Sequence, residues 1–125
     1  MIFGVGVDLV KIPRVKEVIA QWGDRFKNRV FSQGEITYCE RSVRSEERYA
    51  SHFAVKEAFL KALGTGWGRS IGIRDIEVTR NQAGKPSVLL HRKAKKMADE
   101  IGITNVHTSI SHDGEYAVAV VVLEM

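Results

Sequence analysis

The chain has 125 residues, of which 44% are hydrophobic and 27% charged, which predicts one globular domain and excludes a disordered protein. The longest apolar run, 116–123, is too short to span a bilayer. The first residues lack the features of a secretory signal, so we expect a cytoplasmic protein with no membrane partner. Cys39 is the single cysteine, which excludes an internal disulfide, and we interpret it as structural. A net charge of +4 indicates an anionic partner without identifying it.

Residues 2–9 alternate with the period of a β-strand. One face is apolar and consists of Phe3, Val5, Val7 and Leu9. The other face consists of Gly4, Gly6 and Asp8. Because glycines inside a strand allow another element to approach closely, we expect Asp8 to face a packed helix or a ligand rather than open water.

Three helices are predicted next. A proline in the first turn and apolar residues at helical spacing predict a helix over 13–22 that ends at Gly23. The Ser-x-x-Glu pattern at the start of 32–41 is a capping box and opens a second short helix. The longest helical signal covers 45–63, with Gly64 as its stop.

The rest of the chain is mainly β-structure. The predicted elements are a hairpin of strands 73–79 and 87–90, a helix over 94–101, and two closing strands at 106–111 and 116–123. The order is therefore βαααββαββ. This order predicts a single α+β domain in which an antiparallel sheet packs against the long helix.

The long helix contains a carboxylate in an unexpected place. At about 100° per residue, Glu57 lies in the middle of an apolar arc, and a buried carboxylate must be neutral, paired or bound to a cation. Lys61, four residues on, is one available partner, and an ordinary surface ion pair is the simplest interpretation. If Asp8 packs on this helix, two carboxylates meet, and Mg²⁺ would relieve their repulsion because it takes one or two carboxylates together with water and phosphates.

Two other patterns are weaker. The glycine-rich segment 64–68 offers backbone N–H groups to a phosphate, but a helix end followed by a turn is the more usual explanation. His107, Ser109 and Ser111 share one strand face without a Gly-x-Ser-x-Gly elbow, which excludes a serine hydrolase.

The motifs taken together resemble those of the 4′-phosphopantetheinyl transferase family, in its short bacterial holo-acyl-carrier-protein synthase type. The resemblance covers essentially the whole chain and rests on Gly-Val-Gly-Val-Asp at 4–8, Phe-Ala-Val-Lys-Glu-Ala at 53–58, Lys-Ala-Leu-Gly-Thr-Gly at 61–66, Asp-Ile-Glu at 75–77, Gly-Lys-Pro at 84–86 and Ser-Ile-Ser-His at 109–112. It implies the family's fold and transfer of phosphopantetheine from coenzyme A to a serine of an apo acyl carrier protein, with release of adenosine 3′,5′-bisphosphate. It also implies Mg²⁺ dependence and a homotrimer with active sites between subunits.

The resemblance also implies roles for particular residues. The implied metal ligands are Asp8 and Glu57. The implied catalytic residues are Glu57 as the base for the serine proton, Lys61 for the departing phosphate, and Glu35. The implied coenzyme A contacts are Arg44, Lys56, Gly64, Thr65, Gly66 and His107. For Glu35 the capping box, and for His107 a buried histidine that supports its strand, remain alternatives.

The first helix and the segment after it match the region that receives the carrier protein in this family. The residues available there are Arg14, Trp22, Arg25, Phe26 and Arg29. A basic rim would speed encounter with an acidic carrier, although Trp22 and Phe26 also fit a core role. His52 is a departure, because relatives commonly have arginine at this position before Phe-Ala.

Two other classes of protein fit the sequence less well. A small RNA-binding domain needs stacking aromatics on its strands, and after residue 70 only Tyr116 is aromatic, so we expect no nucleic-acid partner. The presence of Asp8, Glu57 and Lys61 argues against a regulatory protein with a decayed site. It would bind neither Mg²⁺ nor coenzyme A.

Overall fold

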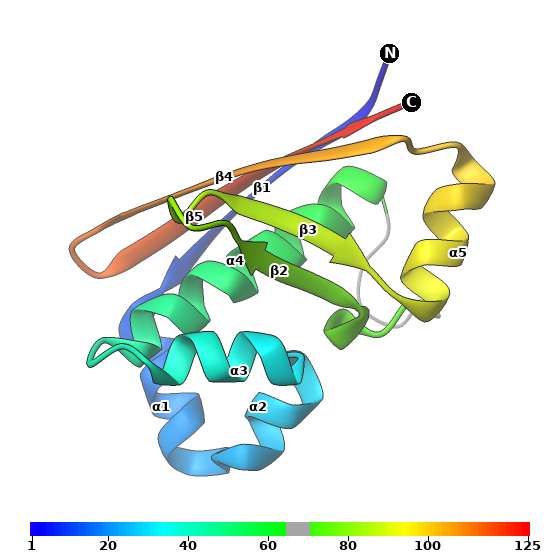
Figure 1. Ribbon diagram of the computed structural model, residues 1–125. Helices are drawn as coiled ribbons and strands as arrows, with labels where there is room; N and C mark the ends of the chain where they lie inside the picture. Colours follow the sequence, from blue (N-terminus) through cyan, green and yellow to red (C-terminus); the bar gives the residue numbers. More distant parts are fainter. Residues whose placement is uncertain (65–70) are drawn as a thin grey trace.

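The computed structural model describes residues 1–64 and 71–125 (Figure 1). Its elements are, in order, β1 (Ile2–Lys11), α1 (Ile12–Trp22), α2 (Asp24–Val30), α3 (Gln33–Glu40), α4 (Ser45–Leu63), a 3₁₀ turn η1 (Ile73–Asp75), β2 (Ile76–Arg80), β3 (Pro86–Leu90), α5 (Arg92–Ile101), β4 (Asn105–Asp113) and β5 (Tyr116–Glu124). The α+β class is therefore confirmed. None of these helices is long and apolar enough to cross a membrane.

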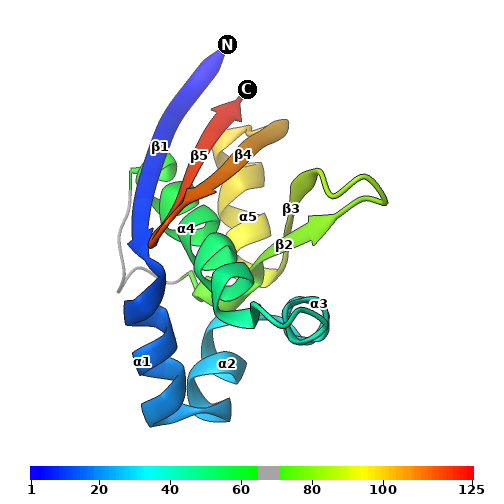
Figure 2. The ribbon, with the colours of Figure 1, turned by 90° about the vertical axis from the view of Figure 1, so that its left-hand side faces the viewer.

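Two antiparallel sheets frame the long helix. The larger sheet has the strand order β1-β5-β4, and β2 and β3 form a separate hairpin. In the larger sheet Asp8 lies opposite Ala119 of β5. Helix α4 runs along one face of this sheet, and α1, α2 and α3 gather near the end where α4 begins (Figures 1 and 2). The predicted packing of an antiparallel sheet on the long helix is confirmed.

Glycines in β1 allow the close contact between strand and helix. A Cβ added at Gly4 would lie 1.9 Å from the carbonyl oxygen of Ala62, and one added at Gly6 would lie 1.9 Å from that of Ala58. No side chain fits such a space, so the glycine face of β1 must meet α4, as predicted. Asp8 lies next on this face and is thereby brought to the helix that carries Glu57.

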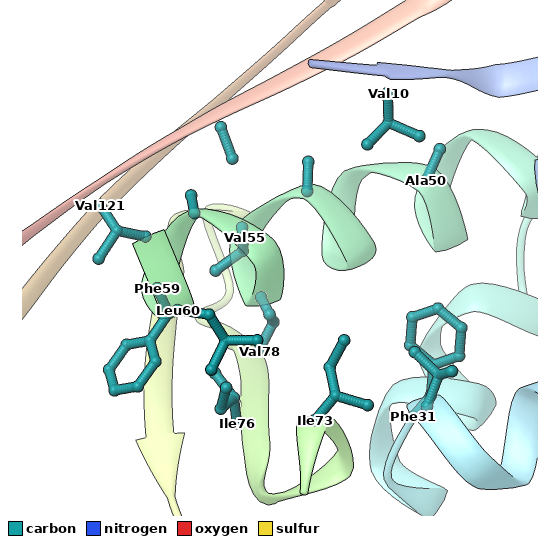
Figure 3. Packing of buried hydrophobic residues seen from close by; sticks show 14 of the residues in the cluster. Val10, Phe31, Ala50, Val55, Phe59, Leu60, Ile73, Ile76, Val78 and Val121 are labelled. Carbon is teal, nitrogen blue, oxygen red and sulfur yellow. The ribbon is translucent and has the colours of Figure 1, made fainter. Parts of the chain in front are cut away.

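Helix α4 is buried around most of its circumference. Val55, Phe59 and Leu60 pack between Val121 of the large sheet and Ile76 at the start of β2 (Figure 3). A helix with apolar contacts on several sides belongs in a core, and burial of each large apolar side chain stabilises the fold by about 1.5–3 kcal/mol. Cys39 is also fully buried, as expected for a structural residue, and burial raises the pKa of its thiol to about 12.

The predicted element order is wrong at one point, because α2 lies between the first two expected helices. This helix has seven residues and few apolar ones, so it gives no helical periodicity. Gly23, with a φ of 54°, ends α1 and also caps the start of α2. The first hairpin strand also begins later than predicted, since 73–75 form the turn η1.

Candidate active site

A hollow of about 370 Å³ opens where the end of β1 meets α1 and α4. Its charged lining residues are Asp8, Lys11, Arg14 and Glu57. The two carboxylates, which are distant in sequence, therefore face one partly buried space. Carboxylates that share such a space repel each other unless cations balance them.

Lys61 supplies one of these cations. Its Nζ lies 3.0 Å from Asp8 Oδ1 and donates a second hydrogen bond, also 3.0 Å long, to the carbonyl oxygen of Val7. The Asp8 side chain is only 16% exposed, whereas that of Lys61 is 55% exposed. The ammonium is thus held beside a carboxylate of the hollow while its long side chain remains accessible to solvent.

Lys11 also lines the hollow and was not predicted from the sequence. It lines the hollow together with Asp8, and it is the last residue of β1. The sequence could have indicated it, because Lys11 follows Asp8 by three residues and therefore lies near the same end of the strand.

Glu35 and Lys56 form a buried polar cluster with His52. Lys56 Nζ donates to Glu35 Oε1 at 2.6 Å, and His52 Nδ1 lies 3.0 Å from Glu35 Oε2. All three side chains are buried, and Glu35 also completes the predicted capping box with Ser32. Burial lowers the pKa values of both His52 and Lys56, an effect that the Glu35 carboxylate opposes. Glu35 and Lys56 are covered by the protein, so neither side chain is open to a ligand that arrives from solvent.

The other expected coenzyme A contacts lie in several places. Gly64 ends α4 with a φ of 85°, as the helix-end interpretation predicted, and Thr65 and Gly66 lie outside the described residues. Arg44 is exposed at the start of α4. The alternative of a buried His107 is wrong, because its side chain is 60% exposed and its Nε2 lies 3.0 Å from Glu124 Oε1.

The expected carrier-binding residues are mostly at the surface. The arginines of this group are exposed: Arg14, Arg25 and Arg29. Trp22 is 49% exposed, and the guanidinium of Arg25 lies 5.7 Å from its ring centroid. Phe26 is half-buried and makes an edge contact with Phe31. The core alternative therefore holds in part for Phe26 but not for Trp22.

A second hollow, of about 280 Å³, is rich in cations. Arg48 and Arg80 both line it, with their guanidinium carbons 4.1 and 5.3 Å from the centroid of the Tyr38 ring. His112 lines it as well, and its Nε2 lies 3.3 Å from Glu47 Oε1. The buried Arg80 Nε has no hydrogen-bond partner among the described residues. The two guanidinium groups could donate hydrogen bonds to an anion bound in this hollow.

This second hollow gathers residues from several predicted motifs. Gly84 and Pro86 come from the Gly-Lys-Pro motif, and His112 comes from Ser-Ile-Ser-His. Arg80 and Tyr38 were not predicted from the sequence. Nothing local in the sequence marks these two residues, because they meet only when β2 packs beside α3.

Comparisons with known proteins agree with the fold and identify the family. Residues 4–121 match the family model described as the 4′-phosphopantetheinyl transferase superfamily, and the chain belongs to that superfamily. A curated relative, the holo-acyl-carrier-protein synthase of Koribacter versatilis, is 43% identical over 124 residues, which cover 99% of each chain. The resemblance inferred from the motifs is therefore confirmed.

Solved structures give the same result. The holo-acyl-carrier-protein synthase of Neisseria meningitidis superposes with a TM-score of 0.92 at 31% identity and covers 100% of both chains. That of Helicobacter pylori, solved in complex with coenzyme A, gives a TM-score of 0.85 at 32% identity over 96% of this chain and 99% of the other.

Proposed function

We propose that the chain transfers 4′-phosphopantetheine from coenzyme A to a serine hydroxyl of an apo acyl carrier protein, with adenosine 3′,5′-bisphosphate as the second product. The proposal depends above all on the convergence of Asp8 and Glu57 on one hollow. The superfamily match and the names of the relatives support the same activity. A coenzyme A complex of a homologous synthase supports the donor.

Asp8 and Glu57 would hold the Mg²⁺ ion that we propose as cofactor. Within residues 1–64 and 71–125, no cluster of three or more His, Cys, Asp or Glu side chains could enclose a metal. Two carboxylates in an open hollow nevertheless fit Mg²⁺, which usually completes its shell with water and substrate phosphates. When bound, the ion would neutralise charge on the pyrophosphate of coenzyme A.

In the proposed reaction, the serine oxygen attacks the phosphorus that carries the pantetheine arm. The bond from this phosphorus to the bridging oxygen breaks, and adenosine 3′,5′-bisphosphate leaves with the electron pair. Glu57 takes the serine proton, directly or through a water. The Lys61 ammonium, already beside Asp8, stabilises the negative charge that develops on the leaving phosphate.

We place a phosphate of the coenzyme A nucleotide in the second hollow. Arg48, Arg80 and His112 line it, and arginine binds phosphate oxygens through several donors at once. Arg44, Gly64, Thr65, Gly66 and His107 remain predicted contacts.

The outer face of the large sheet supports a homotrimer. Three of its β1 side chains are well exposed in the single chain, at 60% for Val5, 57% for Val7 and 62% for Leu9. A contiguous apolar face of this kind marks an interaction surface, and we propose that other copies of the chain cover it. The proposed location is the cytoplasm, as predicted from the sequence.

The carrier protein is proposed to dock beside the first hollow. Arg14 lines this hollow, and Trp22, Arg25 and Arg29 continue an exposed surface over α1 and α2. Positive charge on this surface would guide an acidic carrier toward Glu57. Phe26 would contribute from the wall of the hollow.

A direct assay tests the proposal. The protein is incubated with Mg²⁺, coenzyme A and an apo acyl carrier protein, and the carrier is weighed by mass spectrometry. The carrier should gain one phosphopantetheine group, and a chelator should prevent the gain. An unmodified carrier after prolonged incubation would refute the transferase function.

A further inference from the structure

Lys56 is a cation within the core. Its side chain is 0% exposed, and its Nζ donates to Glu35 Oε1 at 2.6 Å. The same ammonium donates to the carbonyl oxygens of Ile73, at 3.4 Å, and Ile76. A buried ammonium is tolerated only when it is paired and hydrogen-bonded, and here the Glu35 carboxylate and two backbone carbonyl oxygens meet that need.

The partner carboxylate connects further elements. Glu35 Oε1 also accepts from the backbone N–H of Ser32 at 3.1 Å, and Glu35 Oε2 lies 3.0 Å from His52 Nδ1. The Ser32 hydroxyl in turn donates to Glu77 Oε2 at 2.6 Å. A continuous set of polar contacts therefore joins the start of α3, the middle of α4 and strand β2.

These are the elements that bring the second hollow together. Tyr38 lies on α3, Arg48 on α4, and Arg80 at the end of β2, whose first residue is held by Lys56 through its carbonyl oxygen. The two guanidinium groups contact one Tyr38 ring. Their spacing therefore depends on how the three elements are held together.

Neither member of the pair lines either hollow. Successive helical residues point about 100° apart, so Glu57 faces the first hollow while its neighbour Lys56 points into the core. Direct contact with coenzyme A, as the family resemblance implied for Lys56, would require the core to open.

We propose that Lys56 and Glu35 are positioning residues, which fix α3, α4 and β2 so that Arg48 and Arg80 keep the spacing that coenzyme A requires, and that neither touches the substrate. The inference rests on the proposed function, because it assigns coenzyme A to the second hollow. It predicts that the pair controls affinity for coenzyme A and has little direct effect on the chemical step.

The test uses Lys56→Met and the double variant Glu35→Gln/Lys56→Met. The single variant leaves the Glu35 carboxylate buried without its ammonium, whereas the double variant leaves no buried formal charge in this pair. Lys95→Met/Asp99→Asn is the matched control, since Lys95 and Asp99 form a comparable 2.6 Å pair that is exposed. Folding is checked by circular dichroism, and all rates are measured below the melting temperature of the least stable variant.

For the double variant, we expect a KM and a dissociation constant for coenzyme A about tenfold higher than in the parent protein, with kcat within about threefold. It should also be more stable and more active than Lys56→Met. The exposed control should match the parent protein.

A loss of kcat of about 100-fold or more in the folded double variant would overturn the inference, because a group acting on the transition state gives such a loss. Unchanged affinity for coenzyme A would also overturn it. If Lys56→Met fails to fold, the double variant alone decides between these outcomes. Calorimetric titration with coenzyme A needs no carrier, so it tests this inference even if the parent protein fails to transfer the group.

Discussion

The Lys61 ammonium lies 3.0 Å from Asp8 Oδ1, although the two residues are far apart in the sequence. Helical spacing alone points to Glu57 as the partner of Lys61, and the packing of β1 on α4 adds this contact with Asp8. The contact places a half-exposed cation beside one of the two carboxylates that would hold Mg²⁺. In the proposed reaction the Lys61 ammonium would therefore lie close to the departing phosphate.

Replacement of Lys61 by methionine should slow transfer without unfolding the protein. We expect kcat to fall about 10²–10³-fold because the leaving phosphate loses its charge partner. The melting temperature should change little, since an ion pair whose ammonium is half-exposed to solvent contributes about 1 kcal/mol at most. Steady-state kinetics and thermal melts check this, with the exposed Lys95→Met as control. A full rate in Lys61→Met would contradict the assigned role.

Replacement of Glu57 by glutamine removes the proposed base while keeping the shape of the side chain. We expect a loss of about 10²–10⁴-fold in kcat, the usual contribution of a positioned base. Glu100→Gln is the control, because Glu100 is exposed on α5. The role of Glu57 fails if Glu57→Gln still binds Mg²⁺ and coenzyme A and turns over at the parent rate.

A charge on the outer face of β1 should disrupt assembly. Val5 is 60% exposed in the single chain and would be buried between copies in the proposed trimer, so Val5→Glu should give monomers. Light scattering after size-exclusion chromatography measures the mass. Leu89→Glu is the control, since Leu89 is 51% exposed on β3. A parent protein that is already monomeric would rule out the trimer.

His52 should make the fold sensitive to mild acid. Burial lowers its pKa in the folded state, so below the ordinary value of about 6.5 the unfolded chain takes up a proton that the folded chain does not. Stability should therefore fall with pH below about 6.5, by up to about 1.4 kcal/mol per pH unit. The groups near His52 that influence this titration are Glu35, Lys56 and Arg80.

Urea unfolding between pH 7 and pH 5, compared with His52→Asn, measures this contribution. The variant should lose stability less steeply as pH falls, because Asn does not titrate. Equal slopes in the two proteins would assign the acid sensitivity to other groups.

The parts of the fold that follow local rules could be read from the sequence. The glycines of β1 and the capping box of α3 specify their own packing, and the motif at 53–58 places Glu57 on the long helix. Helix α2 has too few apolar residues to give a periodic signal. Its start depends on the backbone of Gly23, which the sequence pattern does not specify.

The burial of Lys56 could not be predicted from the sequence either. Lys56 and Lys61 look equivalent as cations on one helix, but the structure buries Lys56 completely and leaves Lys61 exposed. Which side of α4 is covered depends on where η1 and β2 pack. The pairing of Arg80 with Tyr38 depends on the same long-range contact.

The dependence of transfer rate on Mg²⁺ concentration in Asp8→Asn tests the central claim most directly. Asparagine keeps the size of the side chain but removes one of the two negative charges in the hollow. We expect the variant to need at least about tenfold more Mg²⁺ for half-maximal rate, in line with the usual cost of a weakened metal site. The same half-saturating Mg²⁺ concentration in both proteins would contradict a cation shared by Asp8 and Glu57.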